Sequence, residues 1–457
     1  MSLEAGLEES FSAGYQDVID TTHPASDESG SSYLVAEADS GESEDATEEP
    51  QGYEGEDGDR GLAAYGYESG KITENLSLIA DLNLSYAVSN LDAGDAIEGF
   101  SFNGLLAPIY EISDSRYFIF MYEGVYYKKR DFYSDEYGAK QRVEYQSHTI
   151  TPMFRFDFGE ADRYSLIPLA FYTATLNKDT EDTDWNDGLY NYTDVGAGMD
   201  FEMRDLGVGE ATGVLKMGIQ YYTRNYSNYV SLLDLAIGLD VERDEKDYNG
   251  IIFNAGFDWL KVEGFAWTLN YYFLYKMLDD KKVVNQQGVL TDDEQRDYRH
   301  ILRFKMWYIW TSGLTIGLET SLAMTQSNQN YYDGMGTLLL NDDFFMSDFY
   351  DYTSYRLKPN ISYSFAMIPL TLSFSYAFQE LTYDGRMAKT ANRTYKDDKQ
   401  WETEQEIILA ARYELTERWS LLAQWQQIIA DSNNEDETVY VYDYLVNNYS
   451  IGVSYLF

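Results

Sequence analysis

Apolar and polar residues alternate along most of this chain from about Asn75 onward. In the first such segment an apolar residue occupies every second position: Leu76, Leu78, Ala80, Leu82, Leu84, Tyr86 and Val88. Successive side chains of a β-strand point to opposite faces, so this spacing predicts a strand with one apolar face. Because roughly 10 residues suffice for a tilted strand to cross a membrane, the segment is long enough to do so.

Similar segments recur to the end of the chain, and we expect about 16 strands in all. They are predicted near residues 75–88, 99–111, 116–129, 142–158, 163–177, 188–204, 211–225, 248–260, 264–278, 296–311, 313–326, 348–367, 369–381, 400–414, 417–430 and 439–457. The pattern therefore predicts an all-β protein, an antiparallel up-and-down transmembrane β-barrel.

The connections between these segments alternate between short and long. Short ones are expected at residues 113–115, 159–162, 261–264, 311–313 and 366–369. Long ones are expected at residues 130–141, 178–187, 226–247, 279–295, 327–347 and 382–400. Tight turns on one side and long loops on the other are typical of membrane barrels, and an even strand number places both ends of the barrel on the short-turn side.

The two faces of the predicted strands differ in polarity. Near residues 296–311, for example, Leu302 and Phe304 share one face with aromatic residues, whereas Arg303 and Lys305 share the other. We expect the apolar face to contact lipid and the polar face to line the lumen. The basic residues of the lumen face are Arg155, Lys216, Arg303, Lys305, Arg356, Lys358 and Arg412. The acidic ones are Asp81, Asp157, Asp200, Glu202, Glu319, Glu404 and Glu406.

So many ions in a dry core would cost several kcal/mol for each unpaired charge. A water-filled lumen avoids this cost, and opposed acidic and basic clusters across it resemble the constriction of general porins. The alternative is a plugged lumen whose charges simply pair.

The last residues carry a resemblance to a known class. Tyr449, Ile451, Val453, Tyr455 and Phe457 share one face of the final predicted strand. A chain that ends on an aromatic residue in such a strand resembles bacterial outer-membrane β-barrels, in which the terminal strand is the signal read by the barrel-assembly machinery. The resemblance covers about residues 75–457 and is closest in size to 16-stranded porins. It implies a bacterial outer-membrane location among membrane lipid and lipopolysaccharide.

Composition agrees with a barrel and excludes several other classes. Aromatic residues make up 16% of the chain, with 43 Tyr, and suit a water–lipid boundary. The formal charge of -45 argues against binding nucleic acid. The chain has no Cys, which excludes disulfides and thiolate metal sites, and no apolar run long enough for a transmembrane helix.

Residues 1–70 form a separate region ahead of the barrel at 71–457. Between Met1 and Arg60 the chain has 18 acidic residues and one Lys or Arg, which is Arg60 itself. Such a composition buries too little apolar surface to offset ordering entropy, so we expect a disordered acidic tail. A hook for a periplasmic partner, using Phe11, Tyr15, Val18 and Ile19, is the alternative. Because the first residues lack the basic and apolar parts of a signal peptide, we expect that a signal has been removed or replaced.

The chain shows no constellation that predicts an enzyme, a metal centre or a cofactor. Of its three His, His23 lies in the tail, whereas His148 and His300 lie on the lipid-facing parity without a nucleophile at a readable spacing. Ser147 is adjacent to His148 in sequence, but the strand sends it to the opposite face.

One predicted loop is apolar. It contains Tyr229, Val230, Leu232, Leu233, Leu235, Ile237 and Leu239. If this stretch were exposed to water, its apolar surface would promote aggregation. The stretch is expected to fold into the lumen, pack on the rim or extend the neighbouring strands, unless it is a further strand, which would change the count.

Two functions from different classes follow. The first is a water-filled channel for small hydrophilic solutes or ions, with the lumen charges setting the preference. The acidic excess favours cations, although Arg303, Lys305, Arg356 and Lys358 are close enough in sequence to hold an anion locally. The second is an export or assembly scaffold that works with a periplasmic or surface partner protein.

Overall fold

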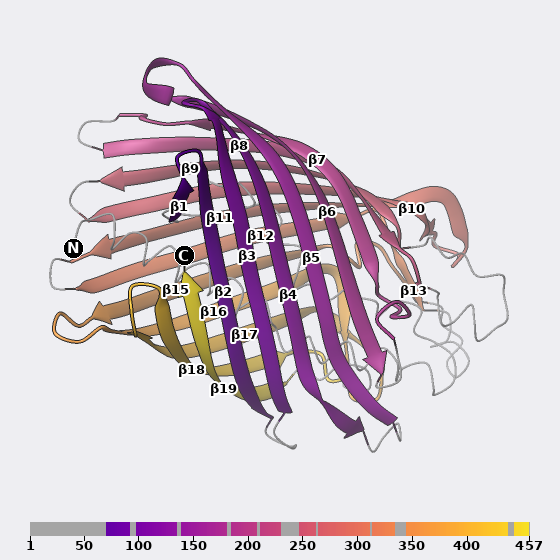
Figure 1. The fold of residues 1–457 in the computed structure, drawn as a ribbon. Helices are drawn as coiled ribbons and strands as arrows, with labels where there is room; N and C mark the ends of the chain where they lie inside the picture. Colours follow the sequence, from indigo (N-terminus) through magenta and orange to yellow (C-terminus); the bar gives the residue numbers. More distant parts are fainter. Residues whose placement is uncertain are drawn as a thin grey trace.

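The computed structural model describes residues 70–91, 97–134, 139–180, 184–207, 211–229, 246–261, 264–310, 313–333, 344–436 and 443–456. Sixteen long strands of this part form one closed antiparallel barrel (Figure 1). They are β2 (Leu76–Leu91), β3 (Ile97–Ser113), β4 (Arg116–Ser134), β5 (Ala139–Phe158), β6 (Tyr164–Thr180), β7 (Tyr192–Met203), β8 (Ala211–Tyr226), β9 (Tyr248–Lys261), β10 (Phe265–Val284), β11 (Leu290–Ile309), β12 (Leu314–Ser327), β15 (Tyr352–Ser364), β16 (Leu370–Lys389), β17 (Tyr395–Glu414), β18 (Trp419–Ser432) and β19 (Tyr444–Leu456).

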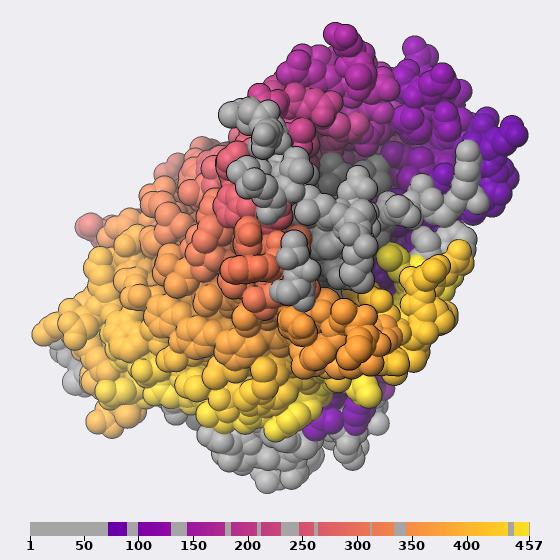
Figure 2. All heavy atoms as spheres, turned by 90° about the vertical axis from the view of Figure 1, so that its left-hand side faces the viewer, coloured from indigo at the N-terminus to yellow at the C-terminus, as the bar shows by residue number. Residues whose placement is uncertain are grey.

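Each strand pairs with its neighbour in sequence, and β19 pairs with β2 to close the circuit. Tyr449 of β19 is the partner of Val88, and Leu456 is the partner of Asp81. Turned by 90°, the space-filling view shows yellow C-terminal strands beside indigo N-terminal ones (Figure 2). Closure satisfies the backbone groups that an open sheet edge would expose to lipid.

All sixteen predicted strands are confirmed, but three predicted long loops are wrong, because strands occupy most of residues 130–141, 279–295 and 382–400. The strand β4 continues to Ser134, and β5 begins at Ala139. The strands β10 and β11 continue through most of residues 279–295 and turn only at 285–289. Likewise β16 and β17 continue through most of 382–400 and turn at 390–394. Both faces of these extensions are mainly polar, so the period-two signal disappears while the ladder continues. The apolar pattern marks the lipid contact and not the strand end.

The outer face of the barrel is apolar, as predicted. Large apolar side chains are exposed at alternate positions of the strands, including Leu84, Phe102, Phe154, Tyr172, Ile219, Leu269, Leu302, Ile316, Ile361, Phe374, Leu409 and Ile451. The short turns are tight because glycine adopts left-handed backbone angles in them: Gly264 has φ 81° and Gly313 has φ 84°. Among the described residues, no helix is long and apolar enough to cross a membrane.

A short strand, β1 (Gly70–Thr73), precedes the barrel and pairs with the first residues of β2. Leu78 is the partner of Gly70, and Leu76 is the partner of Thr73. On its other edge β2 pairs with β3, from Leu76 onward. Since β19 reaches β2 only at Asp81, β1 occupies the stretch of edge that β19 leaves unpaired.

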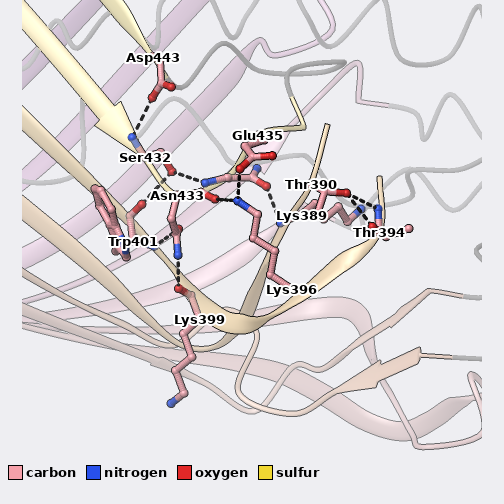
Figure 3. A network of polar contacts seen from close by, with 11 residues as sticks. Lys389, Thr390, Thr394, Lys396, Lys399, Trp401, Ser432, Asn433, Glu435 and Asp443 are labelled. Atoms are coloured by element: carbon pink, nitrogen blue, oxygen red, sulfur yellow. Dashed lines mark hydrogen bonds and ion pairs between the residues drawn. The ribbon is translucent and has the colours of Figure 1, made fainter. Parts of the chain in front are cut away.

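The long-loop end of the barrel is ordered by side chains that link the strand extensions. In Figure 3, Lys396 of β17 lies beside Asn433 and Glu435, at the end of β18; its Nζ is 2.8 Å from Oε1 of Glu435. The amide of Asn433 donates to the carbonyl of Lys399. Strands β13 (Tyr331–Asp333) and β14 (Phe344–Met346) form a small hairpin here, and Phe344 stacks on Tyr395. These contacts hold the β16–β17 extension against the rim.

Candidate functional site

A cluster of basic residues lies on one side of the inner wall. Five cations of the inner face lie on β11 and β15, and we call them the basic wall: Arg299, Arg303, Lys305, Arg356 and Lys358. Glu319 of β12 lies between these two strands; Lys305 is its partner on one side and Lys358 on the other. Lys305 Nζ is 3.5 Å from Glu319 Oε2. The wall therefore has a positive surplus around a single acid.

An acidic group borders the basic wall on β17. Arg356 Nη2 is 2.8 Å from Glu406 Oε2, two strands away, and Glu406 also accepts from the amide of Gln426. Gln426 in turn accepts from the amide of Asn448 on β19. This chain of polar contacts crosses β15, β17, β18 and β19 on the inner face. It fixes the carboxylate of Glu406, which is buried, in one position.

A second charged network lies on β5, β6 and β7, near the short turns. Arg155 is 2.9 Å from Asp157 and 3.6 Å from Glu202, and Arg204 is 2.9 Å from the same oxygen of Glu202. The hydroxyl of Ser165 accepts from both guanidinium groups and donates to Asp157. Two arginines and two carboxylates thus neutralise one another here.

Further charged residues of the inner face lie on the adjacent strands β7, β8 and β9. Lys216 Nζ is 2.8 Å from Asp258 Oδ2. Asp200 is buried on the same face, and neither of its carboxylate oxygens has a hydrogen-bond partner. Burying a carboxylate without a hydrogen bond costs free energy, so Asp200 differs from the paired acids Asp157, Glu202 and Asp258 of this wall.

Sequence reasoning did not identify a tyrosine–cation cluster nearer the long loops. Arg224 of β8 binds Asp194 through Nε at 2.8 Å and Nη2 at 3.0 Å, and its guanidinium lies 4.0 Å from the ring centroid of Tyr192. Close by, Lys246 Nζ lies 4.6 Å from the ring centroid of Tyr229. The signal was present: Tyr222, Arg224 and Tyr226 share the inner parity of β8, and Asp194 shares that of the adjacent strand.

The remaining predicted lumen residues also lie on the parity opposite to the exposed apolar residues. Asp81 accepts from the amide of Asn83, and Glu404 is the cross-strand partner of Gln379. Arg412 is the partner of Thr371 near the short turns. Of the final-strand residues, Tyr449 and Ile451 are exposed on the outer face. Phe457 and the apolar stretch 230–239 lie outside the described residues.

His148 and His300 each contact a tyrosine hydroxyl on a neighbouring strand. His148 Nδ1 is 2.9 Å from the hydroxyl of Tyr122, and His300 Nδ1 is 2.9 Å from that of Tyr271. Ser147 instead hydrogen bonds to Thr175 on the inner face. In the part of the chain that the structure describes, no group of three or more His, Asp or Glu side chains could hold a metal ion.

The closed barrel of sixteen strands, apolar outside and charged inside, is the fold of outer-membrane β-barrel proteins. No protein-family model matches the chain, and no curated protein sequence matches it.

A comparison with solved structures finds outer-membrane proteins that are similar to this chain at low identity. OccAB1 from Acinetobacter baumannii is 11% identical, with a TM-score of 0.43, over 85% of this chain and 98% of that one. OmpT of Vibrio cholerae is 10% identical, with a TM-score of 0.38, over 85% of this chain and all of that one. A bacterial polysaccharide outer membrane secretin is 9% identical, with a TM-score of 0.39, over 83% and 98%.

Proposed function

We propose that this protein forms a water-filled channel through the bacterial outer membrane for small hydrophilic solutes or ions. The observation that carries the proposal is the pair of charged inner surfaces. A basic wall on β11 and β15 surrounds Glu319, and a network of acids and bases follows β5 to β9. A lumen of this polarity needs water to solvate it, and barrels of this size leave room for a channel.

Charges of opposite sign lie on different sides of the proposed lumen. In a circuit of sixteen strands, β7 lies six strands from β15 in one direction, so Asp200 and the basic wall occupy different sides of the barrel. Such a separation sets a transverse field that orients dipolar solutes. Cations are favoured near Asp200, and anions are favoured near Arg303 and Lys305.

The same architecture indicates what the barrel contacts in the outer membrane. The exposed apolar side chains contact membrane lipid, and the long-loop side faces lipopolysaccharide, with divalent cations bridging acidic groups. The final strand, with Tyr449, Ile451, Val453 and Tyr455 on its outer parity, is recognised by the barrel-assembly machinery during insertion.

A second candidate is an export or assembly barrel that acts with a periplasmic or surface partner protein. It is favoured by one feature that a simple channel does not require, the acidic region of 69 residues before β1, which joins the barrel on the short-turn side. In this case the barrel is a conduit or scaffold, and the acidic region binds the partner.

Planar-bilayer conductance of the purified full chain tests the first proposal. Steady single-channel steps, with a reversal potential in asymmetric salt that differs from zero, are expected for an open charged lumen. A membrane that contains correctly folded barrel but shows no steps would contradict the channel and favour the scaffold. Capture of a periplasmic protein that requires the acidic region would then support the second candidate directly.

A further inference from the structure

Ser321, on the inner face of β12, lies between two arginines of the basic wall. It is the register partner of Arg303 on β11 and of Arg356 on β15. The next inner-face residue of β12 toward the long loops is Ala323, which is also short. Two strand spacings, about 10 Å, separate the backbones of the two arginines. The wall therefore carries one guanidinium group on each side of a strand whose own side chains are small here.

Each of these guanidinium groups is held on the side away from Ser321. Arg303 Cζ lies 5.5 Å from the ring centroid of Tyr272 on β10, and Arg356 Nη2 is 2.8 Å from Glu406 Oε2 on β17. In the circuit β10 precedes β11 and β17 lies beyond β15, so neither contact crosses β12. A guanidinium group has five N–H donors. The single hydrogen bond to Glu406 therefore leaves Arg356 able to bind a second acceptor on its other side.

The charges around Ser321 favour an anion over β12. In the neighbouring row of paired residues, Lys305 and Lys358 flank Glu319. Two arginines and two lysines of these rows thus adjoin one carboxylate of β12. Beyond β15, the carboxylate of Glu406 disfavours an anion, because like charges repel. An anionic solute that reaches this wall is therefore attracted to β12 and repelled from β17.

The spacing of the two arginines fits a solute with two carboxylate groups. A guanidinium group binds a carboxylate through two parallel N–H···O bonds, which makes the pair both strong and directional. Because Arg303 and Arg356 are each held on their outer flank, one small carboxylate does not reach both of them. A dicarboxylate places one group at each arginine and its short connecting chain over Ser321.

We propose that Arg303, Ser321 and Arg356 form a binding site for small dicarboxylates on the inner wall. This inference names the solute class of the channel proposed above and rests on that proposal for its role in transport. Binding at the site can be measured without any conductance.

Titration calorimetry of the folded full chain with succinate, at low salt, tests the site. Saturable binding is expected, with an affinity about tenfold or more above that of acetate, because acetate offers one carboxylate to two arginines. Equal affinities for succinate and acetate, or no saturable binding of succinate, would overturn the proposal.

Ser321→Leu tests the position between the arginines without changing any charge. Its larger side chain occupies the place of the connecting chain, so succinate should bind about tenfold or more weakly. Ser450→Leu is the matched control, since it makes the same change on the inner face of β19, five strands from β12 in the circuit. Its affinity should stay within about twofold of the parent chain. An equal loss in both variants would mean that Ser321 is not part of a binding site.

Arg303→Lys tests the requirement for a planar fork, because it keeps the positive charge but binds as a point charge. The preference for succinate over acetate is expected to fall in this variant. If Arg303→Lys prefers succinate as strongly as the parent chain does, the carboxylate does not use the guanidinium group and the proposal is wrong.

Single-channel recordings of the same preparations separate this proposal from the channel. A chain that binds succinate with the expected preference but shows no conductance steps would support the site and reject the channel. A chain that conducts steadily but binds succinate no better than acetate would reject the site and retain the channel.

Discussion

Arg224 and Asp194 form a two-pronged ion pair between β8 and β7, with N–O distances of 2.8 and 3.0 Å. Both residues are buried, at 5% and 1% exposure, and the guanidinium lies over the ring of Tyr192. Arg224→Ala is expected to destabilise the barrel by about 3–5 kcal/mol, because it leaves a buried carboxylate without its partner. Urea unfolding in lipid vesicles measures the loss. Removing both charges, in Arg224→Ala with Asp194→Ala, is expected to cost less than the single change.

An exposed pair on the β10–β11 extension is the matched control. Lys282 and Glu294 are 3.4 Å apart, with side chains 33% and 46% exposed. Lys282→Ala is expected to change stability by about 0–1 kcal/mol, since water and salt screen such a pair. Equal effects of Lys282→Ala and Arg224→Ala would show that burial does not determine the strength of the Arg224 pair.

The preference of the channel for one sign of ion should depend on the basic wall. Lys305→Glu converts one cation beside Glu319 into an anion and is expected to shift the reversal potential in asymmetric salt toward cations. The shift should shrink at high salt, because charges are screened over about 8–10 Å at ordinary ionic strength. Bilayer recordings at two salt concentrations measure both effects.

Lys282→Glu supplies the control for this experiment. Lys282 also lies beside a glutamate, at nearly the same distance as Lys305 from Glu319, but on the strand extension beyond the apolar band. A shift as large as that of Lys305→Glu would mean that surface charge, and not the inner wall, sets the preference.

The sequence predicted the strands well because the lipid contact imposes a rule at every second residue. Each of the sixteen predicted segments overlaps a barrel strand. Within one of them, alternation correctly places Leu302 on the outer face and Arg303 on the inner face. The rule stops where lipid contact stops. Beyond it, β10 continues through Asp279 and β16 through Thr382. The backbone ladder and polar contacts such as Lys282–Glu294 that hold these extensions leave no period-two apolar signal in the sequence.

The inner wall was only partly predictable, for a related reason. Parity assigns Arg224 and Glu406 to the inner face, but it does not give the stagger between strands. The pairing of Arg356 with Glu406 across an intervening strand depends on that stagger. Likewise, the buried cluster of Ala107, Ile119 and Met153 on the inner face cannot be recognised in any one strand, because it forms only when these residues are aligned across neighbouring strands.

Acid should release the β16–β17 extension from the rim. The hydrogen bond and the charge of Lys396 lower the pKa of Glu435. The contact is therefore formed above the ordinary Glu pKa of about 4.3 and is lost as the pH falls through the lowered value. Amide hydrogen exchange around residues 396–399 should speed up over that range, beyond the intrinsic pH effect. Glu435→Gln should exchange fast at every pH after the same correction, and a pH response that persists in this variant would contradict the assignment.

Close packing over β7 gives a final prediction, about Gly196. A Cβ placed on Gly196 would lie 2.8 Å from the carbonyl oxygen of Tyr221 and closer still to the ring of Phe171. Gly196→Ala is therefore expected to destabilise the barrel by about 1–3 kcal/mol, because the backbone of β8 cannot move away without breaking the ladder. Gly99→Ala is the control, since its Cβ would meet nothing nearer than 3.6 Å. Urea unfolding in vesicles should leave Gly99→Ala within about 0.5 kcal/mol of the parent chain. If the two variants unfold at the same urea concentration, Phe171 does not pack over β7 as described.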